Sequence, residues 1–154
     1  NRGRVIGIEQ CAEMMALARA RFASGEPPPN VRLLALPAEQ ARLGHGIDAY
    51  VFSYAHDVMQ SPRALANLFA AANPGARVVI AGLRLLPWSY AAPINLWCCW
   101  RARRYLTTFS GLRCPWANLN AFVPDFRIVR HFHGGTSFVG VGVVGAHSNL
   151  AGTR

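Results

Sequence analysis

The stretch RVIGIE, residues Arg4–Glu9, followed at once by the helical pattern of residues 10–22, decides the fold of this chain. A short apolar strand that ends in an acid and turns into a helix is typical of open α/β sheets. Ligands of such sheets bind outside the carboxyl ends of the strands, where the two oxygens of Glu9 can accept both hydroxyls of a ribose. The stretch therefore predicts a nucleoside site with Glu9 at its rim.

Further apolar runs repeat this pattern along the chain. A short strand is expected at 31–35, a central strand buried on both faces at 48–53, and another buried strand at 76–82. Ser61-Pro62 opens a helix between the last two, because a serine hydroxyl caps a free N–H and proline fits the first helical position. Two β-rich runs separated by Gly134-Gly135 predict an antiparallel hairpin.

Together the runs predict an α/β fold, a Rossmann-like doubly wound and mostly parallel sheet that ends in an antiparallel β-hairpin. One domain is expected over residues 1–146, with a flexible tail at 147–154. A glycine-rich strand-to-helix turn normally precedes an acid such as Glu9, yet only Asn1-Arg2-Gly3 stand before this strand. We therefore expect that the first βα unit of the fold is missing. The segment 85–105 is expected to hold one or two helices, and 115–121 a short one.

Basic residues dominate the charge of the chain. All 16 are arginines, against 7 acids, which gives a formal charge of +9. Chemistry that needs a lysine, such as a Schiff base or a P-loop, is excluded, since arginine stays protonated and cannot act as a base or amine nucleophile. A GC-rich coding preference also produces such a bias, but the positive field still favours anionic surfaces or substrates.

The cysteines and histidines predict no metal site. None of the four cysteines belongs to a C-x-x-C pair, which fits a reduced cytosolic compartment better than a zinc site. His131 and His133 alternate along an expected strand and so share a face, but they lack a third ligand nearby. We interpret them as an exposed hairpin edge. The four cysteines are Cys11, Cys98, Cys99 and Cys114.

The most apolar segment, residues 85–100, is interrupted by two prolines and is too short to span a bilayer. Arginines follow its tryptophans closely. Such a cluster can hold a phosphate or contact an anionic membrane surface, and it can equally be a solvated helix face that covers an aromatic core patch. The cluster consists of Trp97, Trp100, Arg101, Arg103 and Arg104.

These motifs together resemble the class I S-adenosylmethionine-dependent methyltransferases, from Arg4 to Val144. In that family an acid ends the second strand, an acid or amide follows the third, a polar residue ends the fourth, and a Pro-Gly turn introduces the fifth. The family's glycine-rich loop, which cradles the methionine part of the cofactor, has no counterpart here. The run FSYAHDVM at 52–59, followed by RYLTTF at 104–109 and CPW at 114–116, resembles a bacterial subgroup of these enzymes. The matching residues are Glu9, Ala38-Glu39, Ser53-Tyr54 and Asn73-Pro74-Gly75.

The resemblance implies S-adenosylmethionine as the cofactor. Glu9 would accept the ribose hydroxyls, its alternative role being a charge at the helix N-terminus. Met14 could pack on the adenine face, whereas Met15 is expected in the core. Ala38 would offer its backbone N–H to a ring nitrogen, and Glu39 either lies near the adenine amine or is a solvated loop acid. The expected cofactor-binding residues are Glu9, Gln10, Met14, Ala38, Glu39, Ser53 and Tyr54.

The expected reaction centre lies at the mouth of the 48–53 strand. Methyl transfer to an N–H or O–H nucleophile needs positioning and a base that takes the proton. His56 can act as that base near neutral pH, and Tyr54 is the second catalytic candidate. Alternatively, His56 caps the turn or bonds Asp57. A Ser-His-Asp hydrolase is not supported, because no G-x-S-x-G elbow surrounds Ser53.

The sequence thus predicts a cytoplasmic methyltransferase that acts on a small-molecule or lipid-like acceptor, with no nucleic-acid partner. Two rival functions remain open. One is a nicotinamide-dependent oxidoreductase fragment, which would also use Glu9 but lacks the usual lysine. The other is a non-enzymatic module that binds anionic surfaces through its arginines and aromatic side chains.

Overall fold

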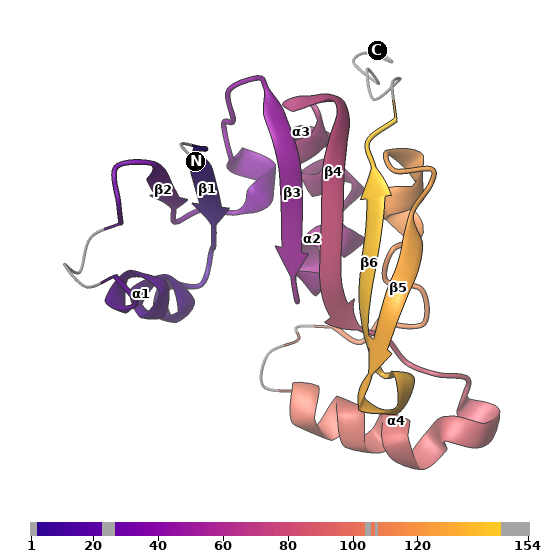
Figure 1. Ribbon diagram of the computed structural model, residues 1–154. Coiled ribbons are helices and arrows are strands. Elements are labelled where there is room, and N and C mark those ends of the chain that lie inside the picture. The colour runs from indigo at the N-terminus through magenta and orange to yellow at the C-terminus, as the bar shows by residue number, and fades with distance from the viewer. Residues whose placement is uncertain (1–2, 23–26, 104–105, 107, 146–154) are drawn as a thin grey trace. The chain divides into compact units, whose positions relative to one another are not determined.

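The computed structural model of the chain describes residues 3–22, 27–103, 106 and 108–145. Its elements fall into two compact units, Asn1–Leu43 and Gly44–Arg154, each with a sheet of its own (Figure 1). The single domain expected over 1–146 stays a prediction, and the tail expected at 147–154 lies outside the described residues.

The first unit is a strand, a helix and a parallel strand, as the opening stretch predicts. It contains β1 (Val5–Ile8), α1 (Ala12–Ala20), β2 (Val31–Leu34) and the short 3₁₀ helix η1 (Ala38–Gln40). The two strands pair in parallel from Val5 opposite Val31 to Ile8 opposite Leu34. Both strands therefore end at the same edge of this small sheet.

The second unit begins with another parallel connection. It runs through β3 (Ile47–Ser53), α2 (His56–Gln60), α3 (Pro62–Phe69) and β4 (Ala72–Leu83). The predicted start of α3 is confirmed, because the Ser61 hydroxyl accepts a hydrogen bond from the Ala64 N–H at 3.1 Å. The Tyr50 hydroxyl donates to the Leu68 carbonyl at 2.7 Å and so ties β3 to α3.

The rest of the second unit contains α4 (Trp88–Ala102), η2 (Ala117–Ala121), β5 (Arg127–Phe132), η3 (His133–Gly135) and β6 (Ser137–Val143). The strand order is β3-β4-β6-β5, with β6 antiparallel to both neighbours. The predicted terminal hairpin is confirmed. The α/β class is confirmed by the parallel pairs β1–β2 and β3–β4, whose strands are connected through helices. The prediction that His131 and His133 share a strand face is wrong, because β5 ends at Phe132 and His133 belongs to η3 with a positive φ of 49°.

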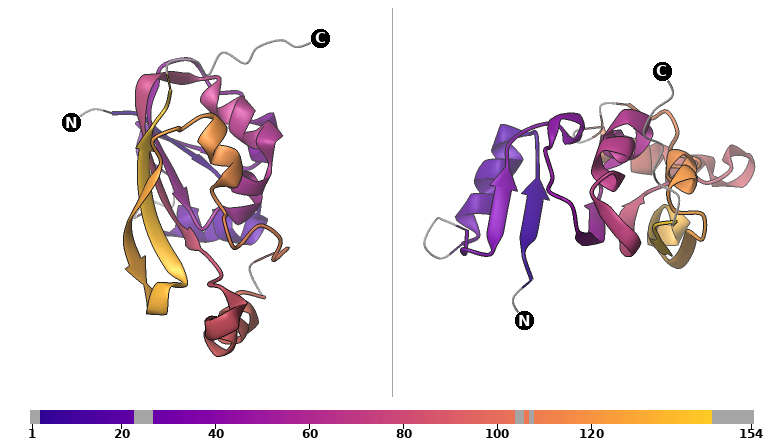
Figure 2. Two further views of the ribbon diagram at one scale, coloured as in Figure 1. Left: turned by 90° about the vertical axis from the view of Figure 1, so that its right-hand side faces the viewer. Right: turned by 90° about the horizontal axis from the view of Figure 1, so that it is seen from above.

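Helices α2, α3 and η2 cover one face of the four-stranded sheet (Figure 2). The core between them is rich in aromatic rings. Tyr50 and Phe69 meet edge to face with ring centroids 4.9 Å apart, and Phe122 of the η2 segment stacks on Phe69 at 5.2 Å. Burying such rings supplies much of the stability of a unit this small.

The prediction that 48–53 forms a central strand buried on both faces is wrong for the part of the chain that the structure describes. Here β3 pairs with β4 alone and lies at an edge of the four-stranded sheet. Burial alternates along it: Tyr50 and Phe52 are buried, while Val51 is 76% exposed. The neighbouring strand β4 alternates in the same way, with Val79 exposed and Val78 and Ile80 buried. An apolar run alone does not show whether its second face is covered.

Helix α4 is the helix that the sequence predicts within 85–105. It bends near its start, where Ala91 leaves helical geometry and Pro93 follows inside the helix. Asn95, which is fully buried, accepts from the Leu86 N–H at 3.0 Å and donates to the Leu86 carbonyl at 2.8 Å. Among the described residues, no helix is long and apolar enough to cross a membrane.

Candidate functional site

Glu9 lies where the sequence places it, directly after β1 at the carboxyl edge of the first sheet. Its backbone N–H donates to the Leu34 carbonyl at 3.1 Å, so Glu9 sits beside the end of β2. Its Oε1 accepts from the Cys11 N–H at 2.8 Å, one residue before α1 begins. The alternative role at the helix start is thus present in the structure. A carboxylate has further acceptor positions, so this bond does not prevent Glu9 from binding hydroxyls.

The other residues predicted to bind the adenosine part flank the same edge of the first unit. Met14 is half exposed on α1, whereas Met15 is buried as expected. Ala38 and Glu39 open η1, which follows the end of β2. Gln10 is exposed in the turn between β1 and α1. The unit therefore presents an acid, a flexible apolar side chain and backbone polar groups around two neighbouring strand ends.

In the second unit, Ser53 is the last residue of β3 and Tyr54 follows it, as predicted. The Tyr54 N–H donates to the Ala81 carbonyl at 2.7 Å, which extends the pairing with β4 by one residue. Tyr54 itself has a positive φ of 52° and an exposed side chain. A bulky residue rarely adopts this conformation, and such strain gathers at functional sites. The strand end thus projects a tyrosine into solvent at a bend of the backbone.

His56, the first residue of α2, is buried rather than exposed at the strand mouth. Its Nε2 lies 3.0 Å from the Ser110 carbonyl oxygen. A carbonyl only accepts, so the neutral ring assigned from this bond carries its proton on Nε2. The buried Nδ1 then keeps a lone pair, and it has no hydrogen-bond partner among the described residues.

Sequence reasoning missed the segment that packs against α2. Gln60 Nε2 donates to the Pro115 carbonyl at 3.3 Å, and Asn118 Nδ2 lies 3.2 Å from the carbonyl oxygens of both Met59 and Gln60. These bonds, together with the one from His56, hold residues 110–118 beside the start and end of α2. No sequence motif predicts these hydrogen bonds, because single amide side chains that bond distant backbone groups produce no spacing pattern.

Among the described residues, the two neighbouring cysteines of α4 do not form a second reaction centre. Burial raises the pKa of the Cys98 thiol, as does the neighbouring Cys99, while a hydrogen bond to Thr136 lowers it. Burial also raises the pKa of Cys99. Both thiols therefore stay protonated near neutral pH and are poor nucleophiles. Among the described residues, no group of three metal-binding side chains comes together.

Comparison with solved structures identifies the fold. NodS, an N-methyltransferase from Bradyrhizobium japonicum WM9, shares 13% identity at a TM-score of 0.57 over 92% of this chain and 74% of its own. SibL, an S-adenosylmethionine-dependent methyltransferase in its apo form, shares 19% at 0.61 over 92% and 43%. A putative O-methyltransferase from Nostoc punctiforme PCC 73102 shares 14% at 0.62 over 91% and 44%.

The fold is therefore that of the class I S-adenosylmethionine-dependent methyltransferases, as the motifs implied. The chain spans between 43% and 74% of the length of these three structures. NodS has also been solved in complex with S-adenosyl-L-homocysteine, at a TM-score of 0.60 and 13% identity over 92% of this chain and 66% of its own. No protein-family model matches the sequence, and no curated protein matches it.

Proposed function

We propose that this protein takes part in S-adenosylmethionine-dependent methyl transfer to a small-molecule or lipid-like acceptor, without a nucleic-acid partner. The observation that carries the proposal is the position of Glu9, directly after β1 and hydrogen-bonded to the last residue of β2, in a methyltransferase fold. In open α/β sheets this edge is where nucleotides bind. A cytoplasmic location belongs to the proposal, supported by cysteines that are free in the structure.

The first unit fits the adenosine half of the cofactor. Glu9 would accept the ribose hydroxyls, and Met14 would cover one face of the adenine. Ala38 and Glu39 would bond its edge through a backbone N–H and a carboxylate. The turn from β1 to α1, Glu9-Gln10-Cys11, contains no glycine. The described residues thus offer groups for the adenosine and no glycine-rich turn for the methionine portion.

When bound, the cofactor supplies an electrophilic methyl group, and the protein has to orient the acceptor and remove its proton. We assign the positioning to Ser53, the last residue of β3, and to Tyr54, which follows it, and we assign removal of the proton to His56 Nδ1. The lone pair of that nitrogen has no hydrogen-bond partner among the residues that the structure describes, which supports the assignment. Since Nδ1 is buried, an acceptor reaches it only when neighbouring atoms move on binding.

The test is ligand-observed NMR, which detects even weak binding of adenosine, S-adenosylhomocysteine and NAD. We expect adenosine and S-adenosylhomocysteine to bind with similar affinity, because the described residues hold only the adenosine end. Glu9→Gln should lower both affinities by roughly ten- to a hundredfold, the range for a lost hydrogen bond to a charged group.

Glu13→Gln is the matched control, since Glu13 is an exposed acid in the first turn of α1. It should leave both affinities unchanged. Binding that survives Glu9→Gln would remove Glu9 from the site. NAD binding more tightly than adenosine would favour the oxidoreductase instead, and no binding of any of the three would overturn the proposal.

A further inference from the structure

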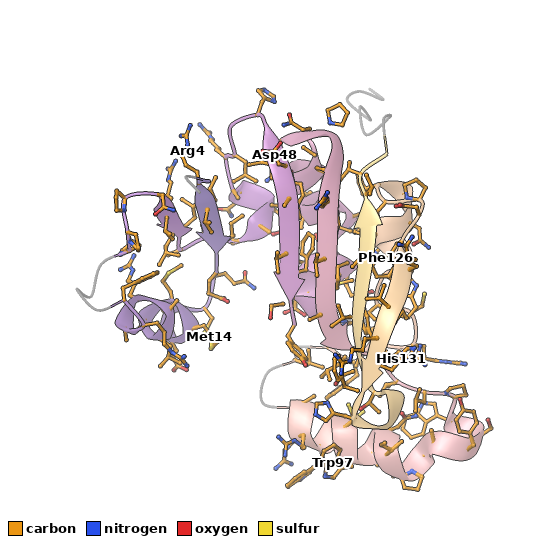
Figure 3. All side chains as sticks on the ribbon, in the orientation of Figure 1. Arg4, Met14, Asp48, Trp97, Phe126 and His131 are labelled. Atoms are coloured by element: carbon orange, nitrogen blue, oxygen red, sulfur yellow. The ribbon has the colours of Figure 1, made fainter. Side chains whose placement is uncertain are left out.

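Helix α4 carries apolar side chains on its outer face as well as its inner one. Its buried side chains recur at helical spacing and define the inner face: Ala91, Asn95, Cys98 and Ala102. The residues on the opposite side are large, apolar and exposed: Tyr90 at 71%, Leu96 at 61%, Trp97 at 49% and Trp100 at 61%. Figure 3 shows Trp97 on the side of α4 that points away from the β5–β6 hairpin. A surface helix normally presents polar residues there.

The inner face of α4 is already packed against the described residues of its own unit. Asn95 forms two hydrogen bonds with the Leu86 backbone. Ile94 approaches so closely that a Cβ on Gly134 would lie 2.6 Å from its side chain. These contacts fix the rotation of the helix. Among the described residues of this unit, none covers the outer tryptophans.

The charged residues in the sequence around this face all have one sign. Between Asp57 and Asp125, every charged residue of the sequence is an arginine. Two of them belong to the face itself: the Arg101 guanidinium lies 5.2 Å from the Trp97 ring centroid, and that of Arg103 lies 5.7 Å from the Trp100 centroid. The partner should therefore combine an apolar layer with negative charge directly above it.

An anionic bilayer surface has both properties. Tryptophan and tyrosine favour the level of the lipid headgroups, and arginines beside them bind phosphates. The 15-residue helix is about 22 Å long, at 1.5 Å per residue, which is shorter than the roughly 30 Å hydrocarbon core. It can lie in the interface but not cross it.

We propose that α4 docks this protein on anionic membranes. Leu96, Trp97 and Trp100 enter the headgroup region, and Arg101 and Arg103 contact lipid phosphates. The proposal does not depend on methyl transfer.

The experiment is co-sedimentation of the full chain with vesicles of pure phosphatidylcholine, or of equal parts phosphatidylcholine and phosphatidylglycerol. We expect binding to the mixed vesicles only, and its loss at roughly 1 M salt, where the Debye length falls to about 3 Å. Arg101→Gln with Arg103→Gln should weaken binding roughly thirtyfold, since each arginine near an anionic surface contributes on the order of 1 kcal/mol. Trp97→Ser with Trp100→Ser should weaken it more than tenfold.

The matched controls carry the same kinds of change elsewhere. Arg63→Gln with Arg77→Gln removes two exposed arginines from α3 and β4, and Leu17→Ser removes an exposed apolar residue from α1. Both should bind the mixed vesicles nearly as wild type. Equal melting temperatures exclude unfolding of the α4 variants, whose altered side chains lie on the outer face.

A second measurement needs no variant. Lipids brominated on their acyl chains should quench the tryptophan fluorescence of the wild-type chain in mixed vesicles. Unquenched fluorescence, or equal binding of wild type and the Trp97/Trp100 variant, would overturn the proposal. So would a tryptophan-dependent dimer in sedimentation velocity that does not bind vesicles, because the face would then pair with a second copy.

Discussion

His56 Nε2 and the carbonyl oxygen of Ser110 lie 3.0 Å apart, although 54 residues separate them in the sequence. The bond joins the start of α2, just after the end of β3, to a segment that follows α4. It gives the histidine a fixed ring orientation, which leaves Nδ1 as the one ring nitrogen able to take a proton. The same bond is therefore structural and, in the proposed function, a positioning contact.

The structural role of His56 and its proposed role as a base can be separated by substitution. In His56→Gln the amide nitrogen can replace Nε2 as donor to the Ser110 carbonyl, but the side chain cannot act as a base. We expect unfolding free energy close to wild type and a large loss of methyl transfer. His56→Ala should lose about 1 kcal/mol or more in urea unfolding, because the buried hydrogen bond disappears and a cavity forms. Full methyl transfer by His56→Gln would limit His56 to the structural role.

The cap of α3 gives a stability prediction that is independent of function. Ser61→Ala removes the acceptor of the Ala64 N–H, and caps of this kind are worth about 1 kcal/mol. We expect that loss in urea unfolding. Ser89→Ala is the control, because Ser89 is exposed in the first turn of α4, where no side-chain cap is formed. An equal loss in both variants would mean that the cap contributes nothing specific.

The parts of the fold that were predictable are those coded by local patterns. Ser61-Pro62 marks the start of α3 and Gly134-Gly135 marks the hairpin turn, because each acts through its nearest neighbours. Strand position was not predictable in the same way. The run around Val51 is apolar at almost every position, whereas its exposure depends on what pairs with and covers the strand.

For the candidate site, the sequence located the strand ends but not what packs behind them. Glu9 and Tyr54 could be placed at strand ends from the sequence, because an acid or polar residue at the end of an apolar run is a local signal. The bond of His56 to Ser110 and those of Asn118 to α2 join segments more than 50 residues apart and involve backbone carbonyls. Every residue has such a carbonyl, so the sequence does not distinguish these partners.

The raised pKa of Tyr50 predicts that the protein loses stability in alkali. Burial raises the pKa of its hydroxyl to about 12, from about 10 in the unfolded chain. The contribution of the neutral Tyr50 hydroxyl to the unfolding free energy is complete below about pH 10. It is lost between about pH 10 and 12, because the tyrosine of the unfolded chain releases its proton first. Unfolding free energy should fall by about 1.4 kcal/mol per pH unit in that window.

Tyr50→Phe isolates this effect. It removes the titrating hydroxyl together with its bond to the Leu68 carbonyl. We expect the variant to lose about 1 kcal/mol at neutral pH and to show a flatter stability profile above about pH 10. Urea unfolding measured across this range checks both. A profile as steep as that of wild type would place the titration on another group.

The last prediction concerns the uncovered face of β3 and β4. Val51 is 76% exposed on the edge strand β3. Val79 on the adjacent strand β4 and Val143 on β6, the strand beyond it, are exposed as well, which gives this sheet an apolar surface beside its edge. Edge strands of this kind associate readily, and a charged side chain on them opposes it. We expect the chain to self-associate with rising concentration, and Val51→Lys to weaken that association at least tenfold in sedimentation velocity. Leu17→Lys adds the same charge at an exposed position of α1 and should change it much less. If both lysine variants weaken association equally, general charge repulsion rather than this face controls it. A wild-type chain that stays monomeric at every concentration would show that the face does not drive association.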